Sequence, residues 1–226
     1  ELTKKGITFD YHNTMPFTID GKLRSGVFEL EGDVSSQYVT GLLFALPLLD
    51  GDSEIRMLSK LESKPYVDLT IACLRHFGIA VQETEQGYAV AGGQQYHACD
   101  LTVEGDYSQA AFFCVANALG SDITLTNLNP ESVQGDKKIV EIVREMCYNR
   151  EQGLPAGFTV DAADIPDLVP ILAVLATFGT APSSITGAHR LAIKESDRLA
   201  STADLLNRLG GKVTATPDGL EIEPVE

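Results

Sequence analysis

The chain has 226 residues, 44% of them hydrophobic, and carries 32 acidic against 17 basic side chains, for a net charge of −15. The hydrophobic content is sufficient for a buried core and argues against disorder. The negative charge argues against binding to nucleic acid or to an acidic membrane. No stretch reaches the roughly 18 apolar residues of a membrane span, so we expect a soluble protein. The four cysteines form no C-x-x-C pair and have no histidine at ligand spacing, which favours a reducing, cytoplasmic compartment without a structural zinc site.

The first predicted element is a β-hairpin at residues 6–20, which we expect to be the tail of a repeat whose front is absent. An internal repeat follows. "LEGDVSSQYVTGLLFALPLL" at 30–49 is echoed by "VEGDYSQAAFFCVANAL" at 103–119 and more faintly by "VDAADIPDLVPILAVLATF" at 160–178. Asp33, Asp106 and Asp164 align at intervals of 73 and 58 residues. Each copy is predicted to run strand, turn, apolar helix, short strand, second helix and β-hairpin.

The helices of each copy differ in pattern. The first is apolar nearly all round, as at 42–49 and 112–115, which predicts a helix buried on all sides. The second is amphipathic, and Gly78 and Gly210 are suited to end two of these helices. Alternation around Gln86-Gly87 and Asp218-Gly219 predicts hairpins. The predicted fold class is therefore α/β, with repeated βαβαββ units in which sheets wall buried central helices.

Each central helix is predicted to open with a small polar cap: Asp33 then Ser35 and Ser36, Asp106 then Ser108, and Asp164 then Pro166 and Asp167. A helix start attracts phosphate or carboxylate through its unpaired N–H groups and partial positive charge. Asp and Ser are also ordinary N-caps, so one such start is not a site.

The first copy adds more polar groups than a cap requires. Ser35, Ser36 and Gln37 follow one another, and Ser63 and Tyr66 stand at the start of the second helix. If neighbouring helix starts face one opening, they form a polar cup for an anionic molecule that carries hydroxyl groups.

Two further stretches carry charge that suits catalysis. Asp167 follows Pro166 at a first-turn position, where a carboxylate can complement the helix dipole or instead grip hydroxyls and accept a proton. In "KESDR" at 194–198, Lys194 and Arg198 are four residues apart, which predicts two cations on one face of a helix, with Glu195 beside them. A solvated charge ladder is the alternative interpretation of this stretch.

Taken together, "SSQ", "SKPYVD", "VEGDYSQA", "QGD", "DIPDLVP" and "KESDR" resemble, in order, the motifs of the 5-enolpyruvylshikimate-3-phosphate synthase family. The resemblance covers essentially the whole chain. It implies an enzyme, a transferase of aromatic amino acid biosynthesis, that joins phosphoenolpyruvate to the 5-hydroxyl of shikimate 3-phosphate and releases phosphate, without metal or organic cofactor. It also implies an inside-out α/β barrel of six βαβαββ copies in two lobes.

The same resemblance implies roles for individual residues. Ser35, Ser36 and Ser63 would hold the 3-phosphate, while Gln37 and Tyr66 would line the shikimate ring.

Asp167, Lys194 and Glu195 would be the catalytic residues. Asp167 would bind ring hydroxyls and act as the base toward the 5-hydroxyl, and Lys194 would bridge the two substrates. Arg198 would hold the phosphate or carboxylate of phosphoenolpyruvate, and Glu195 would handle the proton at its methylene. Arg190 stands where the family often has asparagine, which is a departure from the pattern.

By this resemblance, residues 1–102 belong to the first enolpyruvyl transferase domain and 103–226 to the second. The family's N-terminal and C-terminal basic motifs do not occur in the sequence, so we expect an internal fragment that is inactive by itself and a full-length enzyme that is a monomer. Two alternatives remain: a UDP-N-acetylglucosamine enolpyruvyl transferase, which shares the fold, and a non-catalytic module that binds a partner or self-associates.

Overall fold

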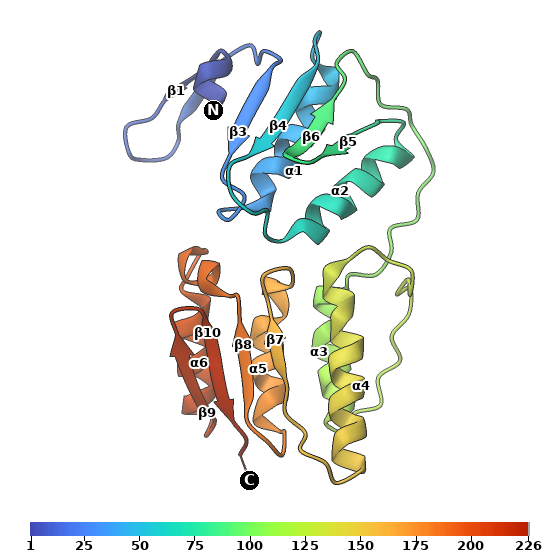
Figure 1. Ribbon diagram of the computed structural model, residues 1–226, viewed down its shortest axis with the longest axis vertical. Coiled ribbons are helices and arrows are strands. Elements are labelled where there is room, and N and C mark those ends of the chain that lie inside the picture. The colour runs from blue at the N-terminus through green and yellow to red at the C-terminus, as the bar shows by residue number, and fades with distance from the viewer. Residues whose placement is uncertain (226) are drawn as a thin grey trace. The chain divides into compact units, whose positions relative to one another are not determined.

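The computed structural model describes residues 1–225 and divides into two compact units, Glu1–Leu101 and Thr102–Glu226 (Figure 1). The first unit begins with a short 3₁₀ helix, Leu2–Lys5, and two antiparallel strands, β1 (Ile7–Asp10) and β2 (Thr18–Gly21). The hairpin predicted at residues 6–20 is therefore confirmed. Its origin in a preceding repeat stays a prediction, as does the assignment of the two units to enzyme domains.

The rest of the first unit is one complete βαβαββ repeat. Its sheet has the order β3-β4-β6-β5, in which β3 and β4 are parallel and the other pairs are antiparallel. One core joins the helices to the sheet, and it includes Phe28, Leu43, Ile55 and Leu74. In chain order the elements are β3 (Val27–Leu30), α1 (Ser36–Ala45), β4 (Ser53–Met57), α2 (Lys64–His76), β5 (Gln82–Thr84) and β6 (Gly87–Val90).

The second unit ends with a repeat of the same topology. Its sheet has the order β7-β8-β10-β9, again with the first two strands parallel and the rest antiparallel. Helices α5 and α6 pack against this sheet (Figure 1). The elements are β7 (Thr159–Asp161), α5 (Val169–Thr177), β8 (Ser183–Thr186), α6 (Arg198–Arg208), β9 (Lys212–Thr216) and β10 (Gly219–Glu223). The predicted βαβαββ order is thus confirmed for the first and third copies.

The middle copy differs from the prediction. It consists of α3 (Tyr107–Ala118) and α4 (Lys138–Glu151), and the described residues 102–158 contain no strand. After α4 the chain leads into β7, so no residues remain for a hairpin, which agrees with the shorter interval of 58 residues between the aspartates. The segments before and after α3 meet through a bond from Gly105 N to Asn127 O, 2.7 Å. Without a hairpin beside them, so few bonds do not make a stable sheet.

The prediction of central helices buried on all sides holds for only one of the three. Helix α5 contacts α3, α6, β8 and β10, and nearly all of its side chains are buried. Helices α1 and α3 have fewer neighbours, and Tyr38, Phe44, Phe112 and Phe113 are each about half exposed, at 46–57%. An apolar pattern alone does not reveal how many elements will surround a helix.

Glycines end the second helices and start the last strands. Gly78 and Gly210 follow α2 and α6 with φ of 81° and 95°, which confirms their predicted role because the left-handed conformation favours glycine. Both hairpins are confirmed, but their glycines begin β6 and β10 rather than lying in the turns. A Cβ atom on Gly219 would lie 1.7 Å from the Ile185 carbonyl oxygen, so glycine lets β10 approach β8.

No described helix is both long enough and apolar enough to cross a bilayer.

We predict opposite effects for two glycine-to-alanine substitutions. Gly219→Ala forces β10 away from β8 and should lower the free energy of unfolding by about 1–3 kcal/mol, as overpacking does. Gly41→Ala, in α1 with no atom within 4 Å of the added Cβ, should raise it by about 0.5–1 kcal/mol because alanine is the better helix former. Urea unfolding followed by circular dichroism measures both. Equal effects of the two substitutions would contradict this account.

Candidate functional site

The predicted site residues of the first unit follow the carboxyl ends of two neighbouring strands. Strands β3 and β4 are parallel, so the starts of α1 and α2 lie at the same edge of the sheet. The two connecting loops touch, since Glu62 N donates to Gly32 O at 3.1 Å. A Cβ atom on Gly32 would lie 2.7 Å from the Lys60 carbonyl oxygen, so glycine is required for this approach. We call Ser35, Ser36, Gln37, Ser63 and Tyr66 the phosphate cluster.

The start of α1 is capped by Ser35 rather than by Asp33. The Ser35 hydroxyl accepts from Gln37 N at 3.3 Å, while the Asp33 carboxylate accepts from Ser59 Oγ at 2.9 Å. Of the residues predicted to form this polar cap, Ser35 makes the capping bond and Asp33 does not. Ser36, the first residue of α1, is buried, and Gln37 is exposed. This helix start presents backbone N–H groups and hydroxyls, which suits an anion.

The start of α2 is formed by a strained residue. Ser63 has φ of 56°, in the left-handed region, and is only 3% exposed. Backbone strain of this kind gathers at ligand-binding positions in proteins. Tyr66 lies one turn into the helix, where its N–H donates to Ser63 O at 3.1 Å. The sequence places Ser63 and Tyr66 here correctly.

Lys64, the first residue of α2, is engaged by acids. Its Nζ lies 2.7 Å from Asp68 and 3.3 Å from Glu83. Burial lowers the pKa of this ammonium, but the hydrogen bond and charge of Asp68 outweigh burial and hold the pKa above its ordinary value. Lys64 thus links α2 to β5.

The predicted residues of the second unit follow the carboxyl ends of its parallel strands, β7 and β8. Asp167 lies in a 3₁₀ turn, Pro166–Leu168, that leads into α5, with Pro166 at its start as predicted. Arg198 begins α6 and donates to Asp167 Oδ1 at 2.8 Å and to Glu195 Oε2 at 2.9 Å. We call Asp167, Lys194, Glu195 and Arg198 the charged cluster. Asp164, predicted in the cap of this copy, lies before the turn and does not cap it, whereas Asp106 caps α3 as predicted.

The prediction that Lys194 and Arg198 share one face of a helix was wrong. Lys194 follows a 3₁₀ helix, His189–Ile193, and its own backbone is extended. Helix α6 begins only at Arg198. Asp197 caps α6, since its carboxylate accepts from Ala200 N at 2.9 Å. An aspartate is among the strongest N-caps, and this cap sets the helix start. The first four residues of "KESDR" therefore form a loop.

Arg198 determines much of the electrostatics of this cluster. The pKa of Glu195 lies below its ordinary value because its own backbone N–H and then Arg198 donate hydrogen bonds to the carboxylate. Partial burial lowers the pKa of the Arg198 guanidinium, but its bonds to Glu195 and Asp167 raise that pKa by more. Both ion pairs are partly exposed to solvent, which screens and weakens them, so an incoming anion can displace them.

The two clusters lie in different units, and a hollow common to both stays a prediction. Within residues 1–225, no three or more His, Cys, Asp or Glu side chains are grouped to hold a metal ion.

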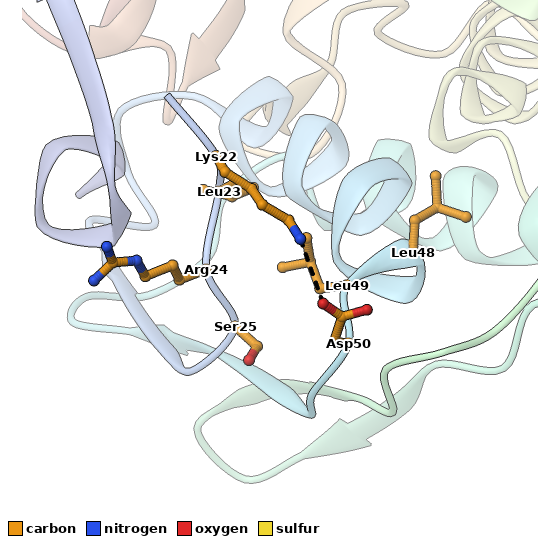
Figure 2. A pocket seen from close by; sticks show the side chains of 7 residues that line it. All are labelled: Lys22, Leu23, Arg24, Ser25, Leu48, Leu49 and Asp50. Atoms are coloured by element: carbon orange, nitrogen blue, oxygen red, sulfur yellow. Dashed lines mark hydrogen bonds and ion pairs between the residues drawn. The ribbon is translucent and has the colours of Figure 1, made fainter. Parts of the chain in front are cut away.

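A cavity of about 270 Å³ in the first unit lies elsewhere. It is lined by Lys22, Leu23, Arg24, Ser25, Leu48, Leu49 and Asp50, before the start of β3 and beyond the end of α1 (Figure 2). Lys22 pairs with Asp50 at 3.5 Å, and Arg24 points away from this pair (Figure 2). None of the predicted site residues lines the cavity. Because the cavity lies at the opposite end of β3 from the predicted site residues, it is not the candidate functional site.

Sequence reasoning missed the contacts that hold the site-bearing turns. Ser59 binds both Gly32 N and Asp33, and Arg190 donates to Ala163 O, although neither residue was a predicted site residue. The signal that could have found them is their spacing within the repeat.

Comparison with known proteins gives consistent matches. A family model described as EPSP synthase (3-phosphoshikimate 1-carboxyvinyltransferase) matches residues 1–226. The 3-phosphoshikimate 1-carboxyvinyltransferase of Clostridium kluyveri is 45% identical over 94% of this chain and 52% of its own length. That of Clostridium beijerinckii is 40% identical over 99% of this chain and 54% of its own length. The chain thus spans about half the length of the curated relatives it matches.

Solved structures share the fold. The EPSP synthase of Acinetobacter baumannii matches with a TM-score of 0.72 and 23% identity, over 98% of this chain and 55% of that chain. The enolpyruvyl transferase NikO of Streptomyces tendae matches with a TM-score of 0.66 and 16% identity, over 99% of this chain and 57% of that chain. The predicted α/β fold class is confirmed by these likenesses.

We predict that Arg198→Ala raises the pKa of Glu195. The substitution removes the guanidinium but leaves the residue's own backbone N–H in place, so the pKa should rise toward its ordinary value without reaching it. Titration of the carboxyl carbon by NMR measures the change. Arg208→Ala is the matched control, because Arg208 pairs with Asp204 at 2.9 Å in the same helix. A Glu195 pKa that is the same in both variants would contradict the prediction.

Proposed function

Because the chain belongs to the family of EPSP synthases, 3-phosphoshikimate 1-carboxyvinyltransferases, as its motifs predicted, we propose that it forms about half of an enolpyruvyl-transferring enzyme. The enzyme moves the enolpyruvyl group of phosphoenolpyruvate to the 5-hydroxyl of shikimate 3-phosphate and releases phosphate. The observation that carries this proposal is the match over residues 1–226, together with the position of "SSQ" and "KESDR" at strand-to-helix connections.

In this proposal the phosphate cluster binds shikimate 3-phosphate. Ser35, Ser36 and Ser63 stand at the starts of α1 and α2, where backbone N–H groups and hydroxyls together favour a doubly charged phosphate. Gln37 and Tyr66 line the ring beside them. The touching loops before the two helices hold these groups at one edge of the sheet.

The charged cluster carries the reaction. Asp167 accepts the proton of the 5-hydroxyl as its oxygen bonds to C2 of phosphoenolpyruvate, and Glu195 delivers a proton to the methylene carbon. In the second step the bond from C2 to the phosphate oxygen breaks and phosphate leaves, while the Glu195 carboxylate takes a proton from the methyl carbon formed in the first step, which restores the carbon–carbon double bond. Lys194 and Arg198 stabilise the negative charge that the substrates bring and develop. The reaction requires neither a metal nor an organic cofactor.

Substrate binding must rearrange the ion pairs of Arg198. The guanidinium that would hold the phosphate or carboxylate of phosphoenolpyruvate is bonded to Asp167 and Glu195. An anion that binds Arg198 therefore replaces the bonds of the guanidinium to both carboxylates. Freed from Arg198, Glu195 is a weaker acid, which suits a group that exchanges protons with a carbon atom.

The proposal extends to the whole enzyme, since this chain covers about half of its relatives. The chain by itself is expected to show no turnover and little or no binding of shikimate 3-phosphate. Full-length enzyme is expected to be a cytoplasmic monomer whose partners are its two substrates.

We test the proposal with a complete chimera, in which this chain replaces the matching segment of the Clostridium kluyveri relative, 45% identical to it. Phosphate release is measured with shikimate 3-phosphate and phosphoenolpyruvate. The chimera should turn over both substrates, and the chain alone should not. A folded chimera without turnover, or steady-state turnover by the chain alone, would overturn the proposal.

We further predict that Asp167→Asn in the chimera lowers kcat by about 10²–10⁴-fold, the usual contribution of a general base. Asparagine has nearly the same size but cannot accept the proton. Asp164→Asn is the control, because Asp164 is an exposed carboxylate just outside the cluster and should leave kcat within about twofold. Equal kcat values for the two variants would remove Asp167 from its assigned role.

A further inference from the structure

One backbone carbonyl accepts a hydrogen bond in all three repeats, although the donor group differs from copy to copy. It belongs to the residue immediately before the aligned aspartate, at the turn that leads into the first helix of each copy. In each case the donor comes from the loop that leads into the second helix. The bonds run from Glu62 N to Gly32 O at 3.1 Å, from Gln134 Nε2 to Gly105 O at 2.9 Å, and from Arg190 Nη2 to Ala163 O at 2.9 Å.

A second regularity concerns the side chains of these loops. Ser59, Ser132 and Arg190 are separated by 73 and 58 residues, the same intervals that separate the aligned aspartates. They therefore occupy one position of the repeat, and we call them the brace residues. Each contacts the turn before the first helix of its own copy, either directly or through one neighbour.

In the first copy the contact is direct. The Ser59 hydroxyl accepts from Gly32 N at 2.8 Å and donates to Asp33 Oδ1 at 2.9 Å. It thus fixes both residues of the turn that precedes Ser35 and Ser36. A hydroxyl that donates and accepts at once leaves the turn little freedom.

In the middle copy the brace acts with a neighbour. The Ser132 hydroxyl donates to Glu104 Oε1 at 2.5 Å and accepts from Gln134 N at 3.1 Å. Gln134 then accepts from Tyr107 N at 2.8 Å and donates to Glu104 at 2.8 Å. This copy has no sheet, yet the same turn is held. None of the predicted site residues lies in this copy.

In the third copy the brace is a cation. Arg190 is 3% exposed, and its guanidinium bonds the Ala163 carbonyl, four residues before Asp167. Arg190 itself lies four residues before Lys194. One side chain therefore ties the loop that carries Asp167 to the loop that carries Lys194 and Glu195.

We propose that Ser59 and Arg190 are positioning residues for the enolpyruvyl transfer. Ser59 sets the turn that presents the phosphate cluster, and Arg190 sets the distance between Asp167 and the "KESDR" loop. The inference rests on the proposed function for its kinetic consequences, and on the hydrogen bonds that the brace residues make to the turns of their own copies for its structural part. Catalytic groups displaced by about 1 Å lose about 10²-fold in rate, so such supports matter for activity as well as for stability.

The kinetic test compares Ser59→Ala, Arg190→Met and Ser132→Ala in the complete chimera. Ser59→Ala should raise KM for shikimate 3-phosphate at least ~10-fold, and Arg190→Met should lower kcat at least ~10-fold. Ser132→Ala is the matched control, because it removes a brace from a copy without site residues and should change neither constant more than about twofold. Ser59→Thr and Arg190→Lys retain a hydroxyl and a donor, and should recover most of each loss.

The structural test uses the 226-residue chain and does not depend on turnover. Amide hydrogen exchange should accelerate at residues 32–37 in Ser59→Ala and at residues 163–168 in Arg190→Met, each at least ~10-fold more than in the other variant. Unchanged exchange at these turns would overturn the proposal whatever the chimera does. Accelerated exchange with kinetic losses equal to those of Ser132→Ala would overturn it too, since the braces would then serve stability alone. If exchange accelerates as expected but the chimera without these substitutions shows no turnover, the proposed function is refuted and the structural part of the inference stands.

Discussion

The parallel pairing of two strands in each four-stranded sheet is the constraint on which the rest depends. Strands β3 and β4, and likewise β7 and β8, run in the same direction, so the two helix starts of one repeat meet at one edge. Every candidate residue follows such a strand end. In the first unit, Gly32 permits the close approach of the loops that precede α1 and α2. Polar side chains and backbone N–H groups therefore lie together at this edge, because the parallel strands bring two helix starts to the same place.

The middle copy shows that the turn before the first helix of a repeat can be retained without a sheet. It has two helices and no sheet, but its turn before α3 is held by Ser132 and Gln134 through four hydrogen bonds to Glu104, Gly105 and Tyr107. The sheet is therefore not needed to hold this turn. In the outer copies the same turn leads to predicted site residues, and a four-stranded sheet is present as well.

Much of this arrangement could be predicted from sequence, because the repeat, the hairpins and the motif order each leave a clear pattern. The errors arose where two patterns competed. The spacing of Lys194 and Arg198 indicated a helix that contains both residues. The Asp197 side chain instead caps α6 and fixes its start at Arg198. Asp33 looked like a cap, but Ser59 engages its carboxylate and Ser35 takes its place. Such choices depend on loops that are distant in sequence, which local propensity cannot include.

The lengths of the strands have a consequence for association between molecules. One outermost strand of each four-stranded sheet, β5 and β7, has only three residues, and all side chains of β5 are exposed and polar. A short polar edge offers few unpaired backbone groups for another chain to extend, which disfavours aggregation by intermolecular strand addition. Lys64 reinforces this at β5, because its bond to Glu83 keeps a charged side chain fixed beside that edge.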